Sequence, residues 1–317
     1  MARINVGVLR GGPSRKYEVS LATGAAVIAA LPEERYNVHD IFISRAGDWH
    51  LRGVPVTPNQ ALRSIDVVFN ALHGEFGEDG VVQKILEVHG IPYTGSGVFG
   101  SALAMDKAQT YIHGKKIQGV KIPQHVVIHS YEVRTSSLQV AQHIFSQFGP
   151  RYVIKPVRGG SSIGGHIANS VHELADMLSE VFDETDTVIV QQHIQGKEGT
   201  CGVVDNLREK RVYALPPVES IYQNPNMVSI DDMCPGNFSR DEKSRMEHAA
   251  REMHRALGLR HYSRSNFIVA PSGIYFLEVN ALPELAPESS LPTALSTVGI
   301  TLSEFLDHVL SLAIARK

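Results

Sequence analysis

Short apolar runs alternate with stretches of helical spacing over the first hundred residues of the chain. The apolar runs are Ile4–Leu9, Val38–Ser44, Ile65–Leu72 and Ile91–Tyr93, and the helical stretches are Glu18–Leu31 and Val81–His89. The third run, IDVVFNAL, is apolar on both faces, as a strand buried inside a parallel sheet should be. The pattern predicts an open parallel α/β domain of the doubly wound, Rossmann-like type over residues 1–100. In such a sheet, loops 11–18 and 73–80 both follow strand ends and converge on one crevice.

The remaining chain divides into two further α+β parts, at 101–197 and 198–317. In the first part we expect helices over 101–115, 137–148 and 171–182, and strands over 151–154, 166–168 and 187–194. In the second part we expect strands over 199–204 and 211–215, a long helix from Ser239 to Leu257, a hairpin over 262–280 and a last helix over 301–315. The polar segment at 219–237 has three prolines in or beside it, which is typical of a mobile loop or lid.

A glycine-rich hairpin, KPVRGGSSIGG at Lys155–Gly165, lies between two strand-like runs of the central part. Glycine and serine remove side-chain bulk and leave backbone N–H groups free to face an anion. Lys155 adds a positive charge at the base of the hairpin. The order of a Walker loop is absent, so the stretch predicts either a different phosphate-binding loop or a flexible hairpin tip.

The last hairpin places polar residues at a spacing of two on each strand. Arg264 and Asn266 lie on the first strand, and Glu278 and Asn280 lie on the second. Because strand side chains alternate between faces, each pair points to one side, and the hairpin brings the pairs together. One acid, two amides and one guanidinium suit a magnesium ion bound with a phosphate. The alternative is the polar outer face of a surface hairpin.

Composition narrows the classes of partner. The chain has 317 residues, 43% hydrophobic and 20% charged, with a formal net charge of -3 and no block of Lys and Arg. We therefore expect small-molecule substrates, and no nucleic-acid or membrane partner. Two cysteines, Cys201 and Cys234, are too few for a disulfide framework, so we expect reduced packing residues in a cytoplasmic protein. A nicotinamide enzyme is disfavoured because G-x-G-x-x-G is absent.

Six blocks in order along the chain resemble the D-alanine–D-alanine ligases of the ATP-grasp superfamily. They are GGPSRKYEVSLATG at 11–24, HGEFGEDG at 73–80, YTGSGVFGSALAMDK at 93–107, KPVRGGSSIG at 155–164, the spaced Gly196 and Glu198, and SRSNF with LEVN and SSLP within 263–292. The resemblance implies an ATP-grasp fold and a cytoplasmic ligase that makes D-alanyl-D-alanine for cell-wall peptidoglycan, with ATP and Mg²⁺ or Mn²⁺. The family is usually dimeric through its N-terminal domain, which implies a homodimer.

The resemblance also implies roles for individual residues. The positions matched to nucleotide and metal binding are Lys107 and Lys155 for the phosphates, Gly160 and Ser162 of the glycine hairpin, Gln191 for the adenine, Glu198 for the ribose, and Glu278, Asn280 and Asn266 for the metal. The positions matched to amino-acid binding and catalysis are Glu18 and Ser161 for the first D-alanine, His73 near its carboxylate, Arg264 for the tetrahedral species and Ser289 for the second substrate's carboxylate. Each has a simpler structural alternative, such as a surface lysine, a turn serine or an acid at a helix N-terminus.

The chain departs from the family pattern in four ways. Asn266 stands where an aspartate is usual, and Glu284 stands where a glycine is usual. No lysine occurs from Arg211 to Asp241, where the family carries one, and Gln191 and Gln192 replace an acid and a lysine at the adenine pocket. The loss of a carboxylate predicts weaker or single-metal binding. The departures leave open a ligase with a different second substrate, or a homologue that binds nucleotide and turns over slowly.

Overall fold

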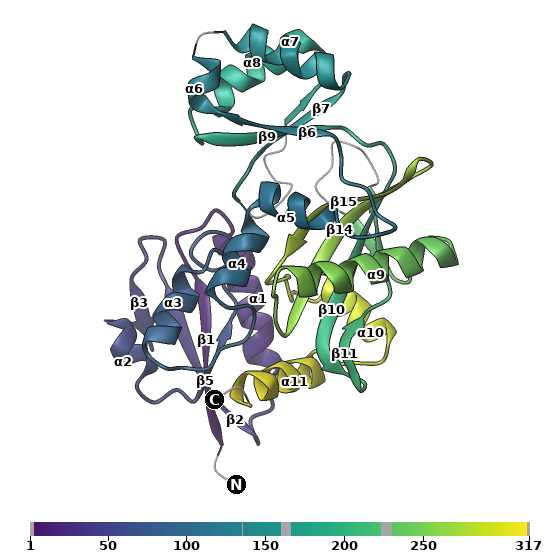
Figure 1. Cartoon of the computed structure of the whole chain (residues 1–317). Coiled ribbons are helices and arrows are strands. Elements are labelled where there is room, and N and C mark those ends of the chain that lie inside the picture. The colour runs from purple at the N-terminus through teal and green to yellow at the C-terminus, as the bar shows by residue number, and fades with distance from the viewer. Residues whose placement is uncertain (1–2, 135, 160–165, 223–229, 316–317) are drawn as a thin grey trace.

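The structure, a computed structural model, describes residues 3–134, 136–159, 166–222 and 230–315. Within these ranges the strands form three sheets that follow one another along the chain, and the second and third sheets bring their edges near helix α5 (Lys107–Gly114) (Figure 1). Helices cover both faces of the first sheet, whereas α7 (Ser137–Gln147) and α8 (Val171–Val181) cover one face of the second sheet and α9 (Arg240–Ala256) covers one face of the third (Figure 1). The uncovered faces of the second and third sheets and the loops at the strand ends of the first sheet are therefore the places where functional residues can lie.

The first sheet has the strand order β4-β3-β2-β1-β5, and its β2-β1-β5 part is parallel. Its elements are β1 (Ile4–Gly11), α1 (Tyr17–Ala30), β2 (Tyr36–Ile43), β3 (Trp49–Leu51), β4 (Val54–Val56), α2 (Pro58–Leu62), β5 (Val67–Asn70) and α3 (Val81–Val88). The parallel part is the predicted α/β unit. The antiparallel β3 and β4 were not predicted, because three-residue strands carry almost no periodic signal. Residues 91–93 form no strand: Tyr93 makes one parallel bridge to Val68, and the chain then turns at Gly95, with φ +91°.

The second sheet is antiparallel with the order β6-β9-β7-β8. Its elements are β6 (His125–His129), α6 (Ser130–Val133), α7 (Ser137–Gln147), β7 (Tyr152–Pro156), β8 (His166–Ala168), α8 (Val171–Val181) and β9 (Thr187–Gln192). Tyr152 and Ile154 of β7 are buried against α7 and α8. Because strand residues alternate, Lys155 points to the opposite face, away from these helices.

The third sheet has the order β13-β12-β10-β14-β15, with β11 paired to β10. Its elements are β10 (Lys197–Leu207), β11 (Lys210–Ala214), β12 (Val218–Tyr222), β13 (Ile230–Met233), α9 (Arg240–Ala256), β14 (Tyr262–Ala270) and β15 (Gly273–Asn280). Phe267 and Phe276 pack with Met246 of α9 on one face, and Cys201 is buried there as a free thiol. The segment expected as a mobile loop at 219–237 contributes β12 and β13, which pair with each other; residues 223–229 lie outside the described residues.

The helix expected over residues 101–115 is two helices, α4 (Val98–Met105) and α5. Asp106 separates them in an extended conformation, and its side chain accepts a hydrogen bond from the Gln109 N–H at 3.0 Å. This N-cap satisfies a backbone donor that the first turn of α5 leaves without an intrahelical partner. The break matters for the site because it makes Lys107 the first residue of α5.

The last two helices are α10 (Ser290–Thr297) and α11 (Leu302–Ile314), and the first of them was not predicted. Phe305, Leu306 and Val309 of α11 belong to one buried cluster with Val6 and Phe69 of the first sheet. The C-terminal helix therefore closes the face of the N-terminal sheet (Figure 1). Apolar burial of this size is the main favourable term in holding the two ends of the chain together.

No single helix in the described part of the chain has both the length and the apolar composition needed to cross a bilayer. Helices α10 and α11 meet that test only when they are joined, and they bend by 102° at their break.

Candidate active site

The polar hairpin predicted from the sequence forms the inner face of the third sheet. In the register of β14 and β15, Asn266 lies opposite Glu278 and Arg264 lies opposite Asn280. The Asn266 Nδ2 donates to Glu278 Oε1 at 3.0 Å, and a β-bulge follows Asn266. The two pairs therefore share one face, opposite the face that packs against α9, as their spacing of two predicted.

This face has the donor set of a metal site. The Oδ1 atom of Asn266 is buried and has no hydrogen-bond partner among the described residues. The Glu278 side chain is 13% exposed, and the Asn280 Oδ1 accepts the Leu282 N–H at 2.9 Å, which leaves it a second lone pair. One carboxylate and two amide oxygens fit a hard divalent cation such as Mg²⁺. An acceptor left unpaired in the interior is costly unless something binds it.

Lys107 contacts this face from the start of α5. Its ammonium donates to the Gly159 carbonyl at 2.7 Å and lies 3.9 Å from Glu278 Oε2. Burial lowers the pKa of Lys107, and the Glu278 carboxylate opposes that effect. For Glu278, burial raises the pKa, but the charges of Lys107, Lys155 and Arg264 outweigh burial and hold it below its ordinary value. The contact joins residues 171 positions apart in the sequence (278 − 107).

Lys155 and Gln191 lie on the inner face of the second sheet. Lys155 is 7% exposed, and the Gln191 Oε1 accepts the Tyr111 hydroxyl at 2.7 Å. In the pairing of β7 with β9, Gln191 lies opposite Val153, so it shares a face with Lys155. The structure therefore places a phosphate-binding candidate and an adenine-binding candidate on one side of one sheet. Glu198 lies on β10, half-buried and in register with Ile268.

Arg264 reaches the start of α10. Its Nη1 donates to the Ser290 Oγ at 2.8 Å, while its Nε is buried without a partner among the described residues. Ser289, the residue matched to substrate binding, precedes α10 and makes no side-chain cap bond. Ser290 was missed in the sequence, although it is the second serine of the SSLP block. Only the fold shows which of the two serines contacts the guanidinium.

The histidine loop of the first sheet is anchored by an acid that the sequence analysis did not single out. His73 is 1% exposed; its Nε2 lies 2.9 Å from Thr23 Oγ1, and its Nδ1 lies 3.3 Å from Glu78 Oε1. Glu78 also accepts the Gly74 N–H at 2.9 Å. Burial raises the pKa of Glu78, but the hydrogen bond with His73 and the charge of Lys16 bring it below its ordinary value.

The other loop of this sheet places its charged residues differently. Glu18, in the first turn of α1, has a side chain that is 76% exposed and accepts from Arg45 Nη2 at 2.9 Å. Lys16, at the N-cap of α1, is only 9% exposed. Lys16 was not predicted as a site residue, because nothing in a lysine's local pattern distinguishes a buried one. Gly160, Ser161 and Ser162 lie outside the described residues, so their predicted roles stay predictions.

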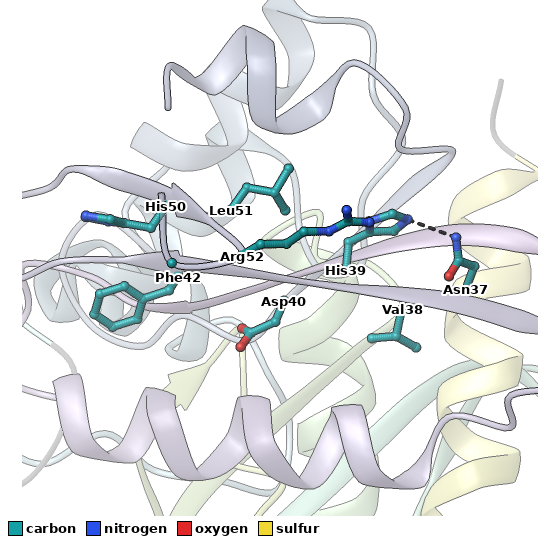
Figure 2. A pocket seen from close by; sticks show the side chains of 9 residues that line it. Asn37, Val38, His39, Asp40, Phe42, His50, Leu51 and Arg52 are labelled. Atoms are coloured by element: carbon teal, nitrogen blue, oxygen red, sulfur yellow. Dashed lines mark hydrogen bonds between the residues drawn. The ribbon is translucent and has the colours of Figure 1, made fainter. Parts of the chain in front are cut away.

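A pocket of about 300 Å³ lies on the first sheet and contains none of these candidates. Figure 2 shows its lining side chains, which come from β2, β3 and the turn after β3 and include His39, Asp40 and Arg52.

Comparison with known proteins decides the family. Residues 115–311 match the family model described as the D-ala D-ala ligase C-terminus, and residues 52–96 match the D-ala D-ala ligase N-terminus. The chain belongs to the D-alanine–D-alanine ligase family. The D-alanine–D-alanine ligase of Fervidobacterium nodosum is 34% identical over 96% of this chain and 97% of its own length. That of Desulforudis audaxviator is 35% identical over 97% of this chain and 98% of its own.

Solved structures confirm the ATP-grasp fold expected for a member of this family. The D-alanine–D-alanine ligase of Bacillus anthracis, solved in complex with ATP, is 28% identical with a TM-score of 0.81 and covers 99% of this chain and 98% of that one. The VanG D-Ala:D-Ser ligase of Enterococcus faecalis is 26% identical with a TM-score of 0.85, covering 98% of this chain and 100% of that one. For this D-alanine–D-alanine ligase family member, the predicted family and fold class are therefore confirmed.

Proposed function

We propose that this chain is an ATP-dependent ligase that joins two D-alanine molecules and releases ADP and phosphate. The observation that carries the proposal is the contact of Lys107 with Glu278, beside Asn266 and Arg264, in a chain of the D-alanine–D-alanine ligase family. A lysine ammonium, oxygen donors suited to a metal ion and a guanidinium with an unpaired N–H lie together there. These are the functional groups that are needed to activate a carboxylate with a nucleoside triphosphate.

The first half-reaction transfers the terminal phosphoryl group. A carboxylate oxygen of the first D-alanine attacks the γ-phosphorus, the bond from that phosphorus to the bridging oxygen breaks, and its electron pair leaves with ADP. Lys107 and Lys155 carry positive charge toward the oxygens on which negative charge collects. Glu278, Asn266 and Asn280 would hold a magnesium or manganese ion, which supplies further neutralisation of the phosphate oxygens when it is bound.

The second half-reaction forms the amide bond. The free amine of the second D-alanine attacks the acyl carbon, one proton is released to solvent, and the tetrahedral oxyanion expels phosphate. Arg264 is the proposed counter-charge for that oxyanion, and its hydrogen bond to Ser290 holds it in place. Ser289, at the start of the same helix, is the proposed contact for the carboxylate of the second D-alanine.

The remaining assignments complete the proposal. We assign the first D-alanine to Glu18, Ser161 and His73, where the exposed Glu18 exchanges its contact with Arg45 for the substrate ammonium. We assign the nucleotide to Gln191 and Glu198, together with Gly160 and Ser162. Because an acyl phosphate hydrolyses in water, the site must close during turnover. The domain limits 1–100, 101–197 and 198–317 belong to this proposal.

A coupled assay tests the function directly. The purified protein is incubated with ATP and Mg²⁺, with D-alanine present or absent, and phosphate release and product mass are measured. We expect release that depends on D-alanine and a product with the mass of D-alanyl-D-alanine, with L-alanine inactive. A Lys107→Met variant should lose the activity, whereas the exposed Lys84→Met should keep it. Failure to bind adenine nucleotide at any magnesium concentration would sink the proposal.

A ligase with a different second substrate is the second candidate, because one solved relative is a D-Ala:D-Ser ligase. Glu284, half-buried beside Pro283, adds a charge near the residues assigned to the second substrate. A panel of D-amino and D-hydroxy acids in the same assay separates the two candidates by product mass. A nucleotide-binding homologue without turnover would bind ATP but release no phosphate with any acceptor.

The cellular setting follows from the proposed product. We propose that the protein acts in the cytoplasm as a homodimer and supplies dipeptide for peptidoglycan precursors. Sedimentation of the purified protein tests the oligomeric state: a mass near 35 kDa, that of one chain, would contradict the dimer.

A further inference from the structure

Lys16 breaks two local rules of helix and burial energetics. It occupies the N-cap of α1 but makes no side-chain cap bond, whereas Ser, Thr, Asp and Asn are the residues that stabilise this position. A cation there also meets the positive end of the helix dipole. In addition, the side chain is 9% exposed, although lysine is seldom buried without a charged partner. Each feature costs stability, which is the pattern expected at a functional position.

No residue that the structure describes forms a hydrogen bond or an ion pair with the Lys16 ammonium. Among the described residues, its ammonium has no hydrogen-bond acceptor and no carboxylate within 4 Å; only its backbone N–H is bonded, to Ser14 Oγ at 2.8 Å. An ammonium with little access to water and no anion beside it is less favourable than one in bulk water. A bound anion would satisfy the ammonium and the helix N-terminus at the same time.

The position of Lys16 points to the anion. Its backbone packs against the histidine loop: a Cβ placed on Gly74 would lie 2.5 Å from Ser14 Oγ and 3.8 Å from Lys16 Cβ. The side chain therefore starts beside the Gly74 backbone, whose N–H binds Glu78. The Lys16 ammonium interacts electrostatically with Glu78 of the histidine loop, and also with Lys107 and Glu278. Lys16 thus lies between the loop assigned to the first D-alanine and the arm assigned to the phosphates.

We propose that Lys16 is a catalytic residue that donates a hydrogen bond to the transferring γ-phosphoryl group, as a third ammonium beside Lys107 and Lys155. This inference rests on the proposed function. Oxygen from the first carboxylate bonds to phosphorus while the bond to ADP breaks, and Lys16 keeps its proton throughout. The segment at 211–241, which approaches Arg264 through Asp232, contains no lysine that could take this place.

The proposal also accounts for the charge balance of the site. Four cations, Lys16, Lys107, Lys155 and Arg264, lie within electrostatic reach of one carboxylate, Glu278. Asn266 contributes no charge. Glu78, Asp106 and Asp232 also act on Lys16, Lys107 and Arg264 respectively, yet four cations gathered about the single carboxylate of Glu278 attract a polyanion. The terminal phosphoryl group carries most of the negative charge that distinguishes ATP from ADP, so ATP should gain more than ADP from Lys16.

The deciding experiment compares Lys16→Met and Lys16→Arg with the wild type and with Lys84→Met, an exposed lysine of α3. Calorimetry with Mg²⁺ measures binding of ADP and of the non-hydrolysable β,γ-methylene analogue of ATP. We expect Lys16→Met to bind the analogue about tenfold more weakly and ADP as the wild type does. It should also reduce kcat, and acyl-phosphate trapping by hydroxylamine, by about 10²- to 10³-fold. Lys16→Arg should recover part of each loss.

Melting of the ligand-free variants separates a catalytic role from a structural one. Removal of a mostly buried, unpaired cation from the helix N-terminus should leave the Tm of Lys16→Met equal to or above that of the wild type. Lys16→Gln, with a polar chain, repeats the comparison if the Met variant folds poorly. Equal weakening of ADP and the analogue, an effect confined to the KM for D-alanine, or unchanged kcat would each overturn the inference. If the wild type makes no dipeptide, the proposed function fails, while the ADP-against-analogue comparison still decides the role of Lys16.

Discussion

Replacing Asn266 with aspartate tests the metal site most directly. In the free protein, the Asn266 amide donates to Glu278 Oε1 at 3.0 Å. Asn266→Asp replaces this charge-assisted hydrogen bond, worth about 1.5–3 kcal/mol, by a contact between two carboxylates. The contact is repulsive while both groups are ionised, so one of them should bind a proton at a raised pKa. Without metal we therefore expect the free energy of unfolding to fall by about 2–3 kcal/mol.

Magnesium should reverse this penalty. A second carboxylate adds a full negative charge to the oxygen donors, so the affinity of the variant for Mg²⁺ should rise at least about tenfold, or about 1.4 kcal/mol. Denaturant unfolding at several Mg²⁺ concentrations measures both quantities, since a ligand that binds only the folded state stabilises it by RT ln(1 + [L]/Kd). The exposed Asn59→Asp carries the same change of charge and should show neither effect. Unchanged stability without metal together with unchanged Mg²⁺ affinity would refute the placement of Asn266 in the metal site.

Three further predictions concern other parts of the molecule. Burial lowers the pKa of His261 to about 4 from 6.5, so the unfolded chain binds a proton at this residue before the folded chain does as pH falls. The contribution of His261 to stability is therefore complete above pH 6.5, and the free energy of unfolding should drop by about 2 kcal/mol between that pH and pH 5. Urea titrations measure this drop, which should be smaller in His261→Gln. Arg264→Met, which removes the donor to Ser290, should lower kcat about 10²- to 10³-fold with little change in the KM for ATP, as steady-state kinetics would show; a normal kcat would exclude the oxyanion role. Gly74→Ala forces a Cβ to 2.5 Å from Ser14 Oγ at φ +72° and should lower the unfolding free energy by about 1–3 kcal/mol; a Tm equal to that of the wild type would contradict this.

Periodicity and motif order were sufficient to predict the features of this protein that depend on residues close together in the sequence. The spacing of two within Arg264–Asn266 and Glu278–Asn280 predicted one polar face because strand alternation is a property of the backbone itself. The glycines and buried runs likewise predicted the parallel unit at the N-terminus. Order and spacing of the six blocks identified the family, which the family models and relatives confirm.

Only the tertiary structure decided which distant residues meet and which lysines are buried. The approach of Lys107 to Glu278 depends on the break at Asp106, which starts a new helix, and on the packing of that helix beside β15. The partner of Arg264 is Ser290 rather than Ser289 because α10 begins between them. The sequence around Lys16 and Glu78 does not distinguish them from surface residues. Their importance follows from their burial and from electrostatic interactions with charged residues on other sheets. Local pattern determines strand, helix and face, whereas charge balance and contact depend on the whole chain being folded.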